Sequence, residues 1–89
     1  MRAVITVIGK DMVGILAKVS TECAKANANV IEVTQSVLQD MFAMIMLVDI
    51  TGMNCQLSQL SETMKELGNS LHLSIHVMHE DIFNSMHHI

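Results

Sequence analysis

The sequence predicts an α+β domain whose elements follow the order strand, helix, strand, strand, helix, strand. Apolar residues recur at every second position in the strand segments and at every third or fourth position in the helical segments. Right-handed crossovers fold this βαββαβ order into a four-stranded antiparallel sheet with two helices on one face, the ferredoxin-like plan. The expected elements are strand 2–8, helix 12–26, strand 30–38, strand 41–50, helix 56–67 and strand 71–77.

The first part of the chain predicts a strand followed by a helix. Residues 2–8 are rich in Val and Ile, and helix 12–26 places Ile15, Val19 and Cys23 on one stripe. The Asn-Ala-Asn segment that follows favours a helix stop, because Asn tolerates left-handed backbone angles. A strand and helix in this order open a crossover unit.

The middle of the chain predicts a hairpin. Residues 30–38 alternate between apolar and polar side chains, as in a half-exposed strand. Residues 41–50 are apolar on both faces except for Asp49, which is typical of a central strand. The short turn 39–40 joins the two strands.

The last third predicts a second amphipathic helix, an edge strand and a tail. Helix 56–67 is expected to end at a C-cap formed by Gly68-Asn69, and strand 71–77 follows. We expect residues 1–80 to form the domain and residues 81–89 to form a C-terminal extension. The extension carries apolar residues at the spacing of a short C-terminal helix: Ile82, Phe83, Met86 and Ile89.

One face of the predicted sheet has no helices, yet strand 2–8 is apolar on both faces. An uncovered apolar patch of several strands invites association. We therefore expect either the tail helix or a second subunit to cover this open face.

Composition limits the class of protein. A chain of 89 residues has only a small core, so further burial in a homodimer or a higher homo-oligomer is expected. A net charge of -4, five Lys and Arg, and no Trp or Tyr argue against direct nucleic-acid binding. The apolar runs are too short for a membrane span, and the start of the chain does not read as a signal peptide. With Cys23 and Cys55 expected as free thiols, a cytoplasmic location is predicted.

The stretch from Gly9 to Ser20 is the candidate binding site, because a glycine-flanked turn there leads into a helix. Backbone amides of Gly14, Ile15 and Leu16 could hold a small anion at the positive end of that helix. Asp11 could either cap the helix or receive an ammonium group. Neither a P-loop nor a G-x-G-x-x-G fingerprint is present.

The histidines, methionines and cysteines are expected to have structural roles. His72 and His76 are expected on one strand face about 13 Å apart, too far to share one ion, with His79 on the other face. We therefore expect no metal site and no cofactor. Met44 and Met46 are expected in the core, with a contribution to a subunit interface as the alternative. Because Cys23 has no His at a suggestive spacing and the carboxylates Glu62, Glu66 and Asp40 are expected on the solvated surface, no catalytic residues and no enzyme activity are expected.

Taken in order, several short motifs resemble the ACT domain, a small-molecule sensing module of amino-acid metabolism. They match over nearly the whole chain, most closely the small free-standing members, which are similar to one half of the glycine cleavage system transcriptional repressor. The motifs are Gly9-Lys-Asp11, Gly14-Ile-Leu16, Val19-Ser20, Asn29-Val-Ile31 and Gln35.

The resemblance implies a site between the turn of one subunit and an edge strand of its neighbour. It assigns the amides of the Gly14-Ile15-Leu16 turn to the carboxylate of an amino-acid ligand and Asp11 to its ammonium group. Asn29 would contact either group, although a turn role for Asn29 is equally open. The implied function is a regulatory, allosteric sensor that acts on a partner protein. The alternative is a ligand-free interaction module that docks a partner through the open sheet face and the apolar tail.

Overall fold

The computed structural model describes residues 1–10 and 13–86, and its elements follow the predicted order. The ferredoxin-like prediction is confirmed, including the short helix at the C-terminus. The elements are β1 (Arg2–Gly9), α1 (Ile15–Lys25), β2 (Asn29–Leu38), β3 (Met41–Asp49), α2 (Leu57–Leu71), β4 (Ser74–His79) and α3 (Glu80–Met86).

The strands form one antiparallel sheet in the order β2-β3-β1-β4, so β2 and β4 are its edges. The predicted hairpin of β2 and β3 is confirmed, and Gln39 takes a left-handed angle at its turn. Gly9 pairs with Phe42 at one end of the sheet, and Arg2 pairs with Asp49 at the other. The edge position predicted for the last strand is also confirmed.

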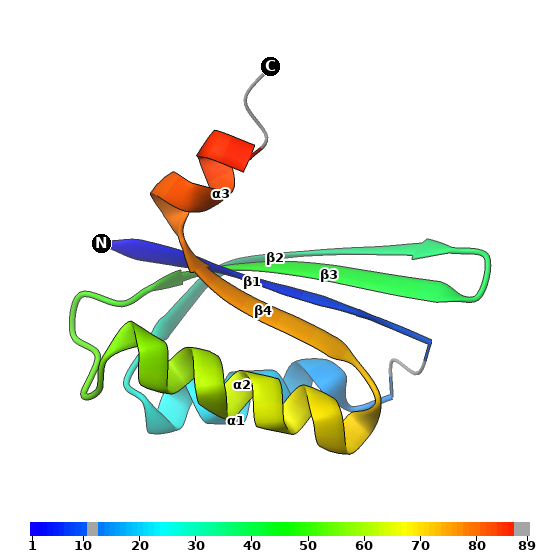
Figure 1. The fold of residues 1–89 in the computed structure, drawn as a ribbon, viewed down its shortest axis with the longest axis horizontal. Coiled ribbons are helices and arrows are strands. Elements are labelled where there is room, and N and C mark those ends of the chain that lie inside the picture. Colours follow the sequence, from blue (N-terminus) through cyan, green and yellow to red (C-terminus); the bar gives the residue numbers. More distant parts are fainter. Residues whose placement is uncertain (11–12, 87–89) are drawn as a thin grey trace.

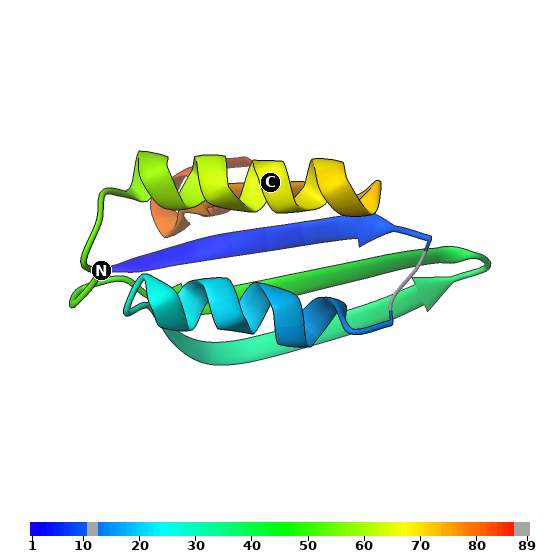
Figure 2. The same ribbon diagram turned by 90° about the horizontal axis from the view of Figure 1, so that it is seen from below.

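The helices lie on both faces of the sheet, but unequally. Figure 1 shows α1 and α2 together on one side of the sheet and α3 on the opposite side. Figure 2 shows α1 and α2 running side by side in opposite directions. α1 contacts β2, and α2 packs mainly on β4.

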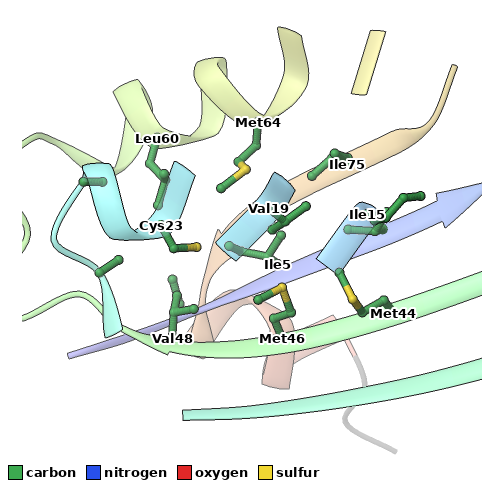
Figure 3. Close-up of a cluster of buried hydrophobic side chains, with 14 of the residues drawn as sticks. Ile5, Ile15, Val19, Cys23, Met44, Met46, Val48, Leu60, Met64 and Ile75 are labelled. Atoms are coloured by element: carbon green, nitrogen blue, oxygen red, sulfur yellow. The ribbon is translucent and has the colours of Figure 1, made fainter. Parts of the chain in front are cut away.

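The main core lies between the sheet and the helix pair α1 and α2. Figure 3 shows side chains of the central strands, among them Ile5 and Met46, meeting Val19, Leu60 and Met64 of the two helices. All of these residues are buried. Met44 is buried in the same cluster, so the core prediction for Met44 and Met46 is confirmed and the interface alternative is wrong.

The end of α2 differs from the prediction. The helix continues through Gly68 and Asn69 to Leu71, and His72 takes the left-handed C-cap position with φ 59°. A Cβ placed on Gly68 would lie 2.8 Å from the carbonyl oxygen of Leu73. Glycine at position 68 is therefore explained by the close approach of α2 to the start of β4, and not by a helix end.

α3 covers part of the sheet face that has no other helix. It contacts β1 and β4, and the guanidinium of Arg2 forms two contacts with the carboxylate of Glu80, at 2.6 and 3.1 Å. This paired geometry fastens the start of α3 to the start of β1. The tail helix is thus one cover of the open face, as expected, although Ile89 lies outside the described residues.

Candidate ligand site at the first strand-to-helix turn

The turn between β1 and α1 ends on a glycine in a conformation that other residues rarely adopt. Gly14 is the N-cap of α1 with φ 72° and ψ 4°, and its carbonyl accepts the first helical hydrogen bond from Lys18 at 3.0 Å. L-residues with a Cβ are strained at this angle. The helix was expected to begin at Met12, but Met12 lies outside the described residues and α1 begins at Ile15.

The start of α1 retains its positive character. No side chain in the described part of the turn caps the helix, and its first turn, which is fully described, carries no acidic residue. The backbone amides there consequently lack intrahelical acceptors, and their dipoles favour a negative charge. Ile15 is buried and fixes the helix on the sheet, whereas Leu16 is exposed.

Space is available in front of this turn. A Cβ built on Gly14 would meet no described atom within 4 Å, so the backbone angle, and not crowding, requires glycine there. The structure therefore brings Gly14, Ile15 and Leu16 together at an open helix N-terminus. Asp11, the fourth residue expected in the turn, lies outside the described residues.

Asn29 lies at the other end of the domain. It is exposed, opens β2 and pairs with Asp49, which also pairs with Arg2. Gly9 is seven positions beyond Arg2 along β1, which is about 23 Å at 3.3 Å per residue. A small ligand at the turn cannot reach Asn29 of the same chain.

The left-handed position after α1 belongs to Asn27 and not to Asn29. Asn27 has φ 58°, and its side-chain amide donates to the carbonyl of Gly52 at 2.7 Å. The turn interpretation of Asn29 is therefore wrong, since Asn29 is already in β2. The Asn-Ala-Asn segment alone does not show which Asn takes the left-handed angle, although Asn27 stands closer to the end of the helical stripe.

A cavity of about 460 Å³ lies at the same end of the sheet as the turn, and its lining includes Gly9, Lys10, His72 and Ser74. The Lys10 ammonium lies 3.8 Å from the carboxylate of Asp40, and both side chains are exposed. His72 reaches this place from the end of α2, so the expectation that His72 and His76 share a strand face is wrong. Within residues 1–10 and 13–86, no group of three or more His, Cys, Asp or Glu residues is placed to hold a metal ion.

The cysteines are both free, as predicted. Burial, together with the nearby charge of Glu22, raises the pKa of Cys23 to about 11. A thiol with this pKa stays protonated near neutral pH and is a poor nucleophile. Among the described residues, no helix is long and apolar enough to cross a membrane.

Comparison with known proteins defines the class to which this fold and turn belong. A family model described as the ACT domain matches residues 2–78. The chain belongs to the ACT-domain family, so the resemblance seen in its motifs is confirmed. ACT domains are regulatory modules that commonly bind amino acids and oligomerise.

Within that class, the chain groups with the UPF0237 proteins. One from Clostridium perfringens is 47% identical over 89 residues, which is 100% of both chains. The structure of an ACT domain protein from Streptococcus pneumoniae has a TM-score of 0.81 at 32% identity and covers 93% of each chain. A protein described as a glycine cleavage system transcriptional repressor has a TM-score of 0.72 at 25% identity, over 85% of this chain and 43% of that one. The predicted similarity to about half of that repressor is confirmed.

Proposed function

We propose that the chain is a homodimeric regulatory domain that binds a small amino acid where two copies meet. The observation that carries the proposal is the start of α1. Its N-cap is Gly14, and no described side chain caps the helix. Such a helix terminus is suited to a carboxylate, because its amides donate hydrogen bonds and its dipole attracts negative charge. Gly14, Ile15 and Leu16 supply these amides.

The ammonium group of the ligand requires an acceptor near the same turn. We assign this role to Asp11, which the family resemblance places there. The exposed side chain of Leu16 offers an apolar contact for the rest of a small ligand. The site therefore favours a free amino acid over a simple anion, since both of its charged groups find partners.

Asn29 completes the site only from a second copy. β2 is an edge strand, so its outer backbone groups can pair with another strand. In antiparallel pairing of two β2 strands, Asn29 of one copy lies beside the end of β2 that is nearest the glycine turn of the other. This arrangement supports a ligand that bridges two subunits, because α1 and its turn lie on the β2 side of the sheet.

Bridging gives the protein its regulatory output. A ligand that contacts both subunits stabilises the paired state by its difference in affinity between the paired and unpaired states. A partner protein that recognises only the paired form would then respond to the concentration of the amino acid. This is the proposed allosteric sensor, with the partner protein as its target.

The first test is a thermal-shift screen of the full chain against the twenty amino acids. A ligand at 100 times its Kd stabilises the folded state by about 2.7 kcal/mol, so a selective rise in melting temperature identifies the effector. The double variant Asp11→Ala and Asn29→Ala should lose the rise. The matched control is Asp81→Ala with Asn84→Ala, which removes the same two residue types from exposed positions of α3 and should keep it.

A second candidate function is a ligand-free module that docks a partner protein. It is favoured by Ile8 and Ile45, which are exposed on the open sheet face, and by the exposed Ile82 of α3. If no amino acid stabilises the protein, and the double variant behaves as the control does, this candidate replaces the sensor.

A further inference from the structure

The open face of the sheet is divided into two halves that differ in their cover. Val4 lies on this face, paired with Leu47 and Met78, yet it is only 3% exposed. α3 covers it, because this helix contacts β1 and β4 and is held by the ion pair of Arg2 with Glu80. The half of the face nearest the start of β1 is therefore filled by the chain itself.

The other half is hollow and apolar. A cavity of about 430 Å³ opens there between the sheet and the edge of α3, where Phe83 and Met86 form one wall. Ile8 and Ile45 line its floor and are 43% and 42% exposed. Among the residues that line the cavity, none is Lys, Arg, Asp or Glu, so the surface does not repel a second apolar surface of the same composition.

α3 itself has more apolar surface than it buries. Phe83 lines the cavity and is partly buried, but Ile82 and Met86 are 55% and 65% exposed. A short helix in water gains little stability on its own, so large exposed apolar residues on it indicate a further contact. Each chain thus carries an apolar helix beside an apolar hollow.

We propose that a second copy of the chain covers this face in a two-fold, face-to-face pair. The two-fold axis of this pair lies between the two sheets and follows the boundary between the halves. The half that α3 covers in one copy then faces the hollow half of the other copy. The α3 helix of each copy then lies on Ile8 and Ile45 of its partner. A self-complementary surface of this kind is what a two-fold interface requires.

The area of the face is sufficient for a specific pair. Four strands about 4.8 Å apart and eight residues long at about 3.3 Å per residue span roughly 500 Å². Two copies would therefore bury about 1,000 Å² of sheet surface, which is the threshold for a biological interface, before the contacts of α3 are added. The flat shape of the domain, 36 × 34 × 19 Å, makes this broad face accessible to a second copy.

This pairing uses a different surface from the β2 edge of the proposed amino-acid site. The two contacts can coexist, and together they give an assembly of four chains when their two-fold axes intersect at right angles. Face pairing alone gives a dimer, and so does edge pairing alone. A tetramer therefore indicates that both contacts form, and for a dimer the effect of variants on the open face shows which of the two contacts is in use.

The test measures the mass of the assembly in solution by light scattering after size-exclusion chromatography of the full chain. Ile45→Glu places a charge in the centre of the hollow and should halve the mass of the wild-type assembly. Ser58→Glu, which adds the same charge to the exposed side of α2, should leave the mass unchanged. Circular dichroism of each variant establishes that the fold persists.

Met86→Glu provides a second reading, because Met86 lies in the last described turn of α3 and does not belong to the sheet. It should also halve the mass. A wild-type monomer of 9.8 kDa overturns the proposal. So does an assembly whose mass neither variant changes, including the case in which native mass spectrometry finds a small apolar molecule or another protein bound instead.

Discussion

The two faces of the sheet carry similar side chains and have different surroundings. On β3, Met46 points toward α1 and α2 and is fully buried (Figure 3), whereas the preceding residue, Ile45, lines the cavity on the other face and is exposed. Both are large and apolar, so residue type does not decide their burial. The elements that lie over each face decide it, and the following predictions test how far that difference extends.

The largest expected effect comes from this neighbouring pair. Met46→Ala removes a side chain from the closed core and should lower the free energy of unfolding by about 2–5 kcal/mol. Ile45→Ala removes a side chain from the hollow and should cost at most about 1 kcal/mol. Urea unfolding at low protein concentration measures both, and equal losses would contradict the difference between the faces.

The second prediction concerns the helix-covered face at the end of α2. Alanine is normally favoured over glycine in a helix by about 1 kcal/mol. At position 68 we expect alanine to be destabilising instead. Its Cβ would lie 2.8 Å from the carbonyl oxygen of Leu73 and 3.1 Å from Cγ1 of Ile75. We expect Gly68→Ala to lose about 1–3 kcal/mol. The exposed neighbour Asn69→Ala is the control and should be neutral or slightly stabilising in the same urea titration.

The third prediction uses the buried thiol of α1. The pKa of Cys23 is raised from the ordinary 9.0 to about 11, first by burial and second by Glu22. The folded protein thus holds the proton more tightly than the unfolded chain does, so stability is complete below pH 9 and falls as the pH rises toward 11. By pH 10 the loss should be about 1 kcal/mol. Cys23→Ala should remove this part of the pH dependence and Cys55→Ala should retain it; the same slope in both variants would refute the assignment.

The smallest effect is expected on the open face, at the ion pair that holds α3. A double-mutant cycle with Arg2→Met and Glu80→Gln should give a coupling free energy of about 0.5–1 kcal/mol, because both side chains remain partly in water. The exposed pair of Lys10 and Asp40, 3.8 Å apart, serves as the comparison and should show almost none. Coupling no larger for Arg2 and Glu80 than for this pair would mean that the contact does not hold α3 in place.

Hydrophobic periodicity predicted every strand and helix of the fold, because burial on one face imposes a period on the sequence. The end of α2 was mispredicted for a physical reason. Gly68 followed by Asn69 is a local stop signal, but the packing of α2 on the start of β4 requires a residue without a side chain at that point. Local sequence cannot distinguish a glycine needed for its backbone angle from one needed for close contact.

The candidate site was predictable in part. Gly14 could be found from the sequence, because a glycine just before a helical stripe is itself the signal for a left-handed angle at the start of a helix. Asn29 could not be placed from the sequence, because within one chain it lies at the opposite end of the sheet from Gly14. Under the proposed function, a second copy brings the two residues together. The hollow at Ile8 and Ile45 could not be placed either, because the sequence shows apolar residues but not which half of the face α3 reaches.

The pairing of β1 with β4 also constrains how the chain reaches this fold. Ala3 of β1 pairs with His79 of β4. The second edge of β1 therefore stays unpaired until β4 is available. Closing so long a loop is entropically costly, so this pairing slows folding relative to a fold built from local contacts. During synthesis the sheet can be completed only after β4 has left the ribosome. The domain should therefore fold in a single cooperative step that requires β4 to be present.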